Sequence, residues 1–121
     1  MGVVYHSEYL VYCEIGRTEL IRSLGLPYAE MERQGLFLAV TEASLRFHAP
    51  ARYDDLLAIE TRLTDVRSRG ISFDYLIRNA DTLVRLVSVR TQLVALDGGS
   101  RLAAIPPHLR QLLASGLDQL R

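Results

Sequence analysis

The chain has 121 residues, of which 49% are apolar, and its 14 basic side chains balance 14 acidic ones. This length and apolar content predict one domain, residues 1–121, with a continuous hydrophobic core. The balanced charge gives no net field toward nucleic acid or an anionic membrane, so neither nucleic-acid binding nor membrane insertion is expected. The sequence shows no signal-peptide pattern and no apolar run of membrane-spanning length, so we expect a cytoplasmic protein.

The single cysteine, Cys13, excludes an internal disulfide and any multi-cysteine metal cluster. Because it lies in an apolar stretch, a small buried side chain is favoured over a reactive thiol. The histidines His6, His48 and His108 are far apart in the sequence, so no metal site is predicted. The sequence contains no Gly-rich phosphate loop and no nucleophile elbow, and no cofactor is expected.

Apolar residues between Ser7 and Leu24 recur at spacings of three and four, which predicts a long helix. Ser7 is a plausible N-cap, and Gly25 is typical of a helix stop. A glycine within a helix costs about 1 kcal/mol relative to alanine. Gly16 therefore indicates that this helix lies very close to another element, and a sheet packed on it would explain the residue. A second, short helix is predicted over residues 28–33.

After Gly35 the apolar periodicity changes to two, which predicts strands with one covered face. The alternation covers residues 45–47, 57–63 and 71–77, and a longer apolar stretch over 83–96 is typical of a central strand. Some of the connections are too short for a crossover helix, so the strands are expected to be antiparallel. A leucine stripe after Pro106 predicts a final helix that covers a sheet edge or a partner chain. The class is α+β, and four strands are one too few to wrap so long a helix.

The segment from Gly2 to Tyr9 leads into the long helix, where backbone N–H groups can stabilise a developing oxyanion. On the residues alone, a plain turn into a helix is the favoured interpretation of the same segment. Arg67 and Arg69 flank Ser68 in the turn before the 71–77 strand. They are suited to charge-assisted hydrogen bonds with a phosphate, or they are the solvated end of a hairpin.

Four ordered segments carry a resemblance to a known family, and the similarity runs over nearly the whole chain. They are Gly2-Val3-Val4-Tyr5-His6-Ser7-Glu8-Tyr9, Arg17-Thr18-Glu19, Gly25-Leu26-Pro27-Tyr28 and Ala49-Pro50-Ala51-Arg52-Tyr53-Asp54-Asp55. This set resembles the hotdog-fold acyl-CoA thioesterases of the 4-hydroxybenzoyl-CoA thioesterase type, in particular the bacterial branch associated with the Tol-Pal system. The resemblance implies a long helix wrapped by a five-stranded antiparallel sheet, assembled as homodimers or homotetramers. The family's first strand precedes the glycine of the motif, which places it upstream of Met1.

The resemblance also implies roles for individual residues at the start of the long helix. The family's catalytic aspartate stands three residues before the motif glycine, which corresponds to Gly2, so its position lies outside this chain. The backbone N–H of His6 corresponds to the group that polarises the thioester carbonyl. Glu8 stands where relatives commonly have asparagine, and it is a candidate substitute base or nucleophile.

The resemblance assigns coenzyme A phosphate binding to Arg67 and Arg69. The sequence therefore predicts hydrolysis of an acyl-CoA to the free acid and coenzyme A. The alternative is an acyl-CoA-binding or scaffold dimer that lacks turnover because the aspartate is absent. A hotdog dehydratase or hydratase is a third reading, but no matched pair of aspartate and histidine supports it.

Overall fold

The computed structural model describes residues 6–52 and 54–117, which form three helices and four strands. In chain order the elements are α1 (His6–Ser23), α2 (Tyr28–Arg33), β1 (Phe37–Phe47), β2 (Leu57–Val66), β3 (Gly70–Asn79), β4 (Arg85–Leu96) and α3 (Pro107–Ala114). All seven agree in type with the elements expected from the periodicity. Gly2, to which the resemblance assigns a role, lies outside the described residues.

The strands form one antiparallel sheet in the order β1-β4-β3-β2. The predicted central position of β4 is confirmed, since β4 pairs with β1 on one side and β3 on the other. The strand begins at Arg85, two residues later than the apolar run, because Leu83 adopts a left-handed turn conformation with φ 63°. Within the described residues, β1 and β2 are the edge strands.

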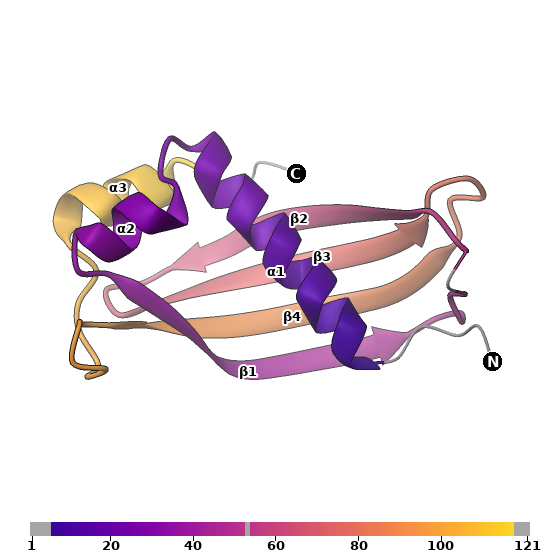
Figure 1. Ribbon diagram of the computed structural model, residues 1–121, viewed down its shortest axis with the longest axis horizontal. Helices are drawn as coiled ribbons and strands as arrows, with labels where there is room; N and C mark the ends of the chain where they lie inside the picture. Colours follow the sequence, from indigo (N-terminus) through magenta and orange to yellow (C-terminus); the bar gives the residue numbers. More distant parts are fainter. Residues whose placement is uncertain (1–5, 53, 118–121) are drawn as a thin grey trace.

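Helix α1 lies across one face of this sheet, and among the described residues no other helix lies across the sheet (Figure 1). The close approach expected at Gly16 is confirmed: a Cβ placed on this residue would lie 2.3 Å from Oγ1 of Thr61 on β2. The helix begins at His6, so Ser7 lies in its first turn and the predicted N-cap position was wrong. It ends at Ser23, before Gly25 with its φ of 93°.

The core lies between α1 and the inner face of the sheet, which is the face that α1 covers. Its largest fully buried side chains include Tyr9 and Leu20 of α1 with Phe73 and Ile77 of β3. Residues of alternate parity on each strand point to the opposite side, which we call the outer face. The fold therefore has two layers, the helix α1 and the sheet, and the outer face of the sheet is exposed to solvent.

Helices α2 and α3 lie together at the end of the sheet where β1 begins (Figure 1). The leucine stripe of α3 is confirmed in part, since Leu109 and Leu113 are buried. After the helix, Leu117 forms a bridge with Leu63 of the edge strand β2. Of the two sequence alternatives for this helix, the structure thus supports cover of a sheet edge.

Candidate active site

The first turn of α1 begins at His6, and the first amides of any helix have no intrahelical acceptor. Such amides carry partial positive charge and can hold an anion or a developing oxyanion. The role considered for His6 requires only its main-chain N–H. The helix thus supplies the backbone geometry that an oxyanion site needs.

Tyr9 connects this first turn to the loop that follows β1. Its side chain is 2% exposed, and its ring packs edge-to-face on Phe47 at the end of β1, with 5.8 Å between centroids. Burial raises the pKa of the Tyr9 hydroxyl, while a hydrogen bond from the main chain of Ala51 opposes that rise. Two of the segments that resemble the thioesterases, residues 2–9 and 49–55, are therefore in contact.

Glu8 lies on the same turn and is half-buried. Its carboxylate accepts a hydrogen bond of 3.4 Å from the hydroxyl of Tyr12, one turn further along α1. Burial and the negative charge of Glu8 together raise the pKa of Tyr12. A carboxylate therefore stands near the helix start, held by a neighbouring side chain of the same helix.

Arg67 and Arg69 lie at the other end of the sheet. Their turn joins β2 to β3. Gly70, at the end of this turn, pairs with Val94 of β4, and Val94 pairs on its other side with Ala39 of β1. The start of α1 packs instead on Phe47, eight residues further along β1. At about 3.3 Å per residue this separation is roughly 25 Å, so one chain does not bring the two predicted parts of the site together.

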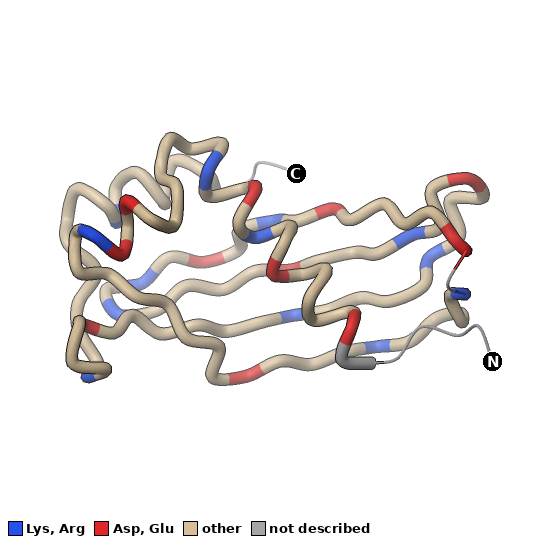
Figure 2. Tube along the Cα trace, in the orientation of Figure 1, with Lys and Arg blue, Asp and Glu red and all other residues tan. Residues whose placement is uncertain are grey.

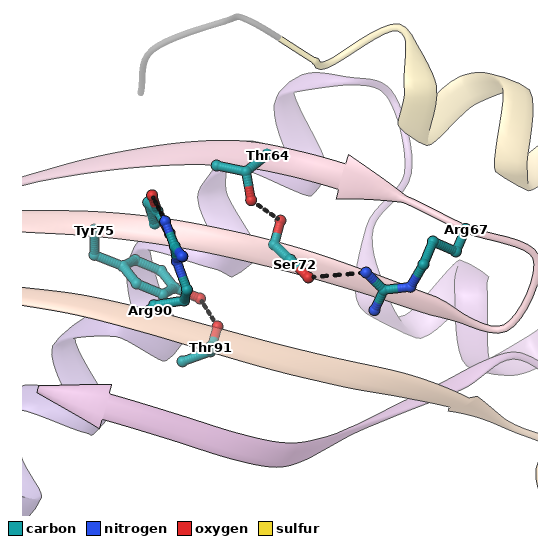
Figure 3. Close-up of polar contacts among 7 residues, drawn as sticks. Thr64, Arg67, Ser72, Tyr75, Arg90 and Thr91 are labelled. Atoms are coloured by element: carbon teal, nitrogen blue, oxygen red, sulfur yellow. Dashed lines mark hydrogen bonds and ion pairs between the residues drawn. The ribbon is translucent and has the colours of Figure 1, made fainter.

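The Arg67 side chain folds over the outer face (Figure 3). It forms an ion pair with Asp65 and donates a 3.4 Å hydrogen bond to the hydroxyl of Ser72. The Arg67 side chain is still about half exposed, so its guanidinium remains accessible to solvent. The Arg69 side chain is exposed and has no ion-pair partner among the residues that the structure describes. Both arginines can receive an anion from solvent.

Helix α1 carries a buried arginine, Arg17, to which the sequence analysis assigned no role. The Arg17 side chain is 7% exposed and donates hydrogen bonds to the hydroxyls of Tyr28, at 3.0 Å, and Tyr75, at 3.1 Å. Tyr75 in turn shares a 3.0 Å hydrogen bond with Thr91 of β4 (Figure 3). Arg17 was visible in the sequence only as part of a resembling segment, because its partners come from α2 and β3 and meet it only in the folded chain.

Cys13 is buried in the same layer, and desolvation raises the pKa of its thiol to about 12. A thiolate is therefore scarce at neutral pH, which agrees with the predicted structural role. Within residues 6–52 and 54–117 no group of three or more potential metal ligands gathers. None of the helices in this described part has the length and apolar character needed to cross a membrane.

Comparison with known proteins identifies the class to which this geometry belongs. Residues 1–113 match the thioesterase-like superfamily, and the chain belongs to that family. Its long helix packed on an antiparallel sheet is the hotdog arrangement that the sequence led us to expect.

Individual relatives agree with this assignment. The chain is 34% identical to acyl-CoA thioester hydrolase YbgC of Escherichia coli over 80 residues, which cover 66% of this chain and 60% of that protein. It is 30% identical to the acyl-acyl carrier protein thioesterase ATL3 of Arabidopsis thaliana over 118 residues, 98% of this chain and 62% of the relative. The matches thus span about three fifths of the length of these two relatives.

A solved structure gives the same answer for the fold. The hypothetical protein TT1821 of Thermus thermophilus superposes with a TM-score of 0.87 at 36% identity, covering 96% of this chain and 88% of that one. The arrangement of helix and strands is therefore shared over nearly the whole of both chains.

Proposed function

We propose that the protein hydrolyses acyl-CoA thioesters to the free acid and coenzyme A. The observation that carries this proposal is the start of α1 packed against the 49–55 loop, in a chain that belongs to the thioesterase-like superfamily. Helix amides at that position suit the negative charge that develops on a thioester carbonyl oxygen when a nucleophile attacks it.

In the proposed mechanism, the amide of His6 receives the carbonyl oxygen. A carboxylate three residues before Gly2 acts as nucleophile or as general base toward water.

The finer assignment, to the Tol-Pal-associated bacterial branch, is part of the proposal. The four ordered segments that carry the family resemblance support it.

We propose that a strand preceding Gly2 pairs with β1. Within the described residues β1 is hydrogen-bonded on one side only, to β4, so its other edge offers a row of backbone donors and acceptors. Such a strand would carry the carboxylate to the start of α1, because α1 begins beside the far end of β1.

The decisive experiment compares acyl-CoA turnover by the 121-residue chain with that of a form extended by the genomic sequence upstream of Met1. If the extension contains an aspartate three residues before Gly2, we expect turnover that falls at least 100-fold on replacing that aspartate with asparagine. An extended form that binds acyl-CoA without turnover would instead establish the scaffold reading. A panel of acyl chains would define the specificity.

Glu8 has a separate test. If it replaces the upstream carboxylate, Glu8→Gln abolishes turnover by the 121-residue chain. Unchanged turnover would remove Glu8 from the mechanism. Glu14→Gln, on an exposed position of the same helix, is the matched control for loss of one negative charge.

Arg67 and Arg69 are proposed to hold the coenzyme A phosphates. Because each chain separates them from its own α1 start, we propose that the complete site combines residues of two subunits in a homodimer or homotetramer. Exposed apolar side chains of α1 and β1, including Val11, Ile15 and Phe47, support such assembly. Arg67→Ala and Arg69→Ala should raise KM about tenfold each with little change in kcat. Equal KM values in wild type and variants would leave both as hairpin residues.

The size of the particle in solution, measured by sedimentation, tests the assembly. We also propose a cytoplasmic location.

A further inference from the structure

The outer face of the sheet carries an open groove that the proposed thioesterase site does not use. Its volume is about 640 Å³, and all four strands line it. The polar lining includes Ser44 and Arg46 of β1, Arg62 of β2, Asp74 of β3, and Arg85 and Arg90 of β4. The groove lies across the sheet from α1 and is therefore on the side opposite the helix start.

Positive charge is concentrated in this groove although the whole chain has no net charge. Of its two carboxylates, Asp74 is held by Arg90 through bonds of 2.8 and 3.1 Å, and Glu60 pairs with Arg78 at 3.3 Å. Three arginines of the lining, Arg46, Arg62 and Arg85, have no ion-pair partner among the residues that the structure describes. Figure 2 shows acidic positions along α1, on the other side of the sheet.

The register places the arginines within reach of one ligand. Arg46 stands opposite Ser88 on β4, and Arg90 is two residues along the same strand. Diagonal neighbours of this kind are about 7–8 Å apart at the backbone, a distance that arginine side chains span easily. Arg62 lies in the cross-strand row of Arg90 with Asp74 between them, at roughly two strand spacings, about 10 Å.

Neutral polar side chains lie beside the arginines on β1 and β4. The hydroxyl of Ser88, half-buried in the groove, lies 2.8 Å from Nε2 of His48, which follows the end of β1. A hydroxyl and an imidazole beside guanidinium groups are suitable donors for the oxygens of a phosphate. The groove thus offers several donors from two adjacent strands.

The chemistry favours a small ligand over a protein. The volume falls in the range of small-molecule sites, about 300–1,000 Å³. Protein interfaces are enriched in aromatic side chains. Tyr75 is the aromatic residue of the lining, and its hydroxyl points to Arg17 on the inner side. A second copy packed here by a two-fold axis would set the same arginines against one another.

We propose that the outer face binds a free nucleotide with two or more phosphate groups through Arg46 and Arg62, which lie on either side of the Arg90–Asp74 ion pair. Guanidinium forks match phosphate oxygens in pairs, and two forks without a carboxylate partner among the described residues suit such a ligand. This inference is independent of thioester hydrolysis, because it concerns binding to the face opposite α1.

Titration calorimetry of the full chain with ADP and with inorganic pyrophosphate tests the proposal. Arg46→Gln and Arg62→Gln should each weaken binding at least tenfold, and both side chains are exposed, so folding should be retained. Arg110→Gln removes the same charge from an exposed position of α3 and should change the affinity less than twofold. Circular dichroism of each variant checks that the fold is kept.

Coenzyme A, titrated in parallel, tests whether the groove instead receives the nucleotide end of the substrate. Loss of ADP affinity with unchanged coenzyme A affinity in Arg46→Gln supports a free nucleotide, whereas loss of coenzyme A affinity overturns the proposal and assigns the groove to the thioesterase substrate. The proposal is overturned if neither ADP nor pyrophosphate binds at millimolar concentration, or if Arg110→Gln weakens binding as much as the groove variants do. It also fails if Arg46→Gln changes only the sedimentation of the protein, because the face would then be an interface between copies.

Discussion

The two faces of the sheet are built from the same alternating strands and differ in what covers them. The inner face packs Phe73, Ile77 and their neighbours under α1, with one arginine, Arg17, bonded to neutral hydroxyls. The outer face carries arginines at the alternate positions, partly paired with Asp74 and Glu60. Because side chains alternate along each strand, a residue that stabilises the fold and a residue that is available to a ligand are immediate neighbours in the sequence.

This difference indicates where stability and specificity lie in the molecule. Substitutions on the inner face should change the free energy of unfolding, while substitutions on the outer face should leave it almost unchanged and alter binding.

The largest effect is expected at Phe73, which is 0% exposed. Phe73→Ala should lower the free energy of unfolding by about 3–5 kcal/mol, because it removes buried ring contacts and leaves a cavity. Arg62→Ala, on the other face of the adjacent strand, should change it by about 0.5 kcal/mol or less. Urea denaturation measures both. Similar losses in the two variants would mean that the outer face is also packed in the folded protein.

The second effect tests the contact between α1 and the sheet. Gly16→Ala places a Cβ 2.3 Å from Oγ1 of Thr61, a short and fully buried side chain that has little freedom to move. We expect a loss of about 2 kcal/mol, since overpacking outweighs the gain in helix propensity.

A double-mutant cycle supplies the control for Gly16. In a Thr61→Ala background the hydroxyl is absent, so Gly16→Ala should be neutral or stabilising by up to about 1 kcal/mol. The same loss in both backgrounds would place the clash somewhere other than Thr61.

Much of this inner layer could be predicted from the sequence, because periodicity depends on neighbours in the chain. The spacings of three, four and two gave the helices and strands, and Gly16 indicated the close approach. The Arg17 network could not be predicted, since Tyr28, Tyr75 and Thr91 meet only through the tertiary register. The same holds for the outer groove, whose arginines come from three strands.

The third prediction compares two tyrosine hydroxyls. That of Tyr75 is buried between Arg17 and Thr91, whereas that of Tyr12 makes one part-buried bond of 3.4 Å to Glu8. Tyr75→Phe should cost about 1.5 kcal/mol, because it leaves a buried guanidinium with one fewer acceptor. Tyr12→Phe should cost about 0.5 kcal/mol or less. Thermal melts of the pair would refute a structural role for the network if the two variants behaved alike.

The smallest effect concerns Cys13 and alkaline pH. Burial raises the pKa of its thiol to about 12 from 9.0. The folded state therefore retains a proton that the unfolded state releases, so the stabilisation is complete below pH 9 and is lost as the pH rises toward 12. Between pH 9 and 10 the loss should be about 1 kcal/mol, from the factor of about 1.4 kcal/mol per pKa unit.

Cys13→Ala isolates this contribution from those of Tyr9 and Tyr75, whose pKa values are also raised by burial. The variant should lose less stability than the wild type between pH 9 and 10, whatever the cost of the smaller side chain at neutral pH, because that cost does not depend on protonation. Urea titrations at both pH values measure the difference in slope. If the free energy of unfolding changed equally with pH in both proteins, the thiol would be in contact with water in the folded state. The packing between α1 and the inner face would then be looser around Cys13 than the structure indicates.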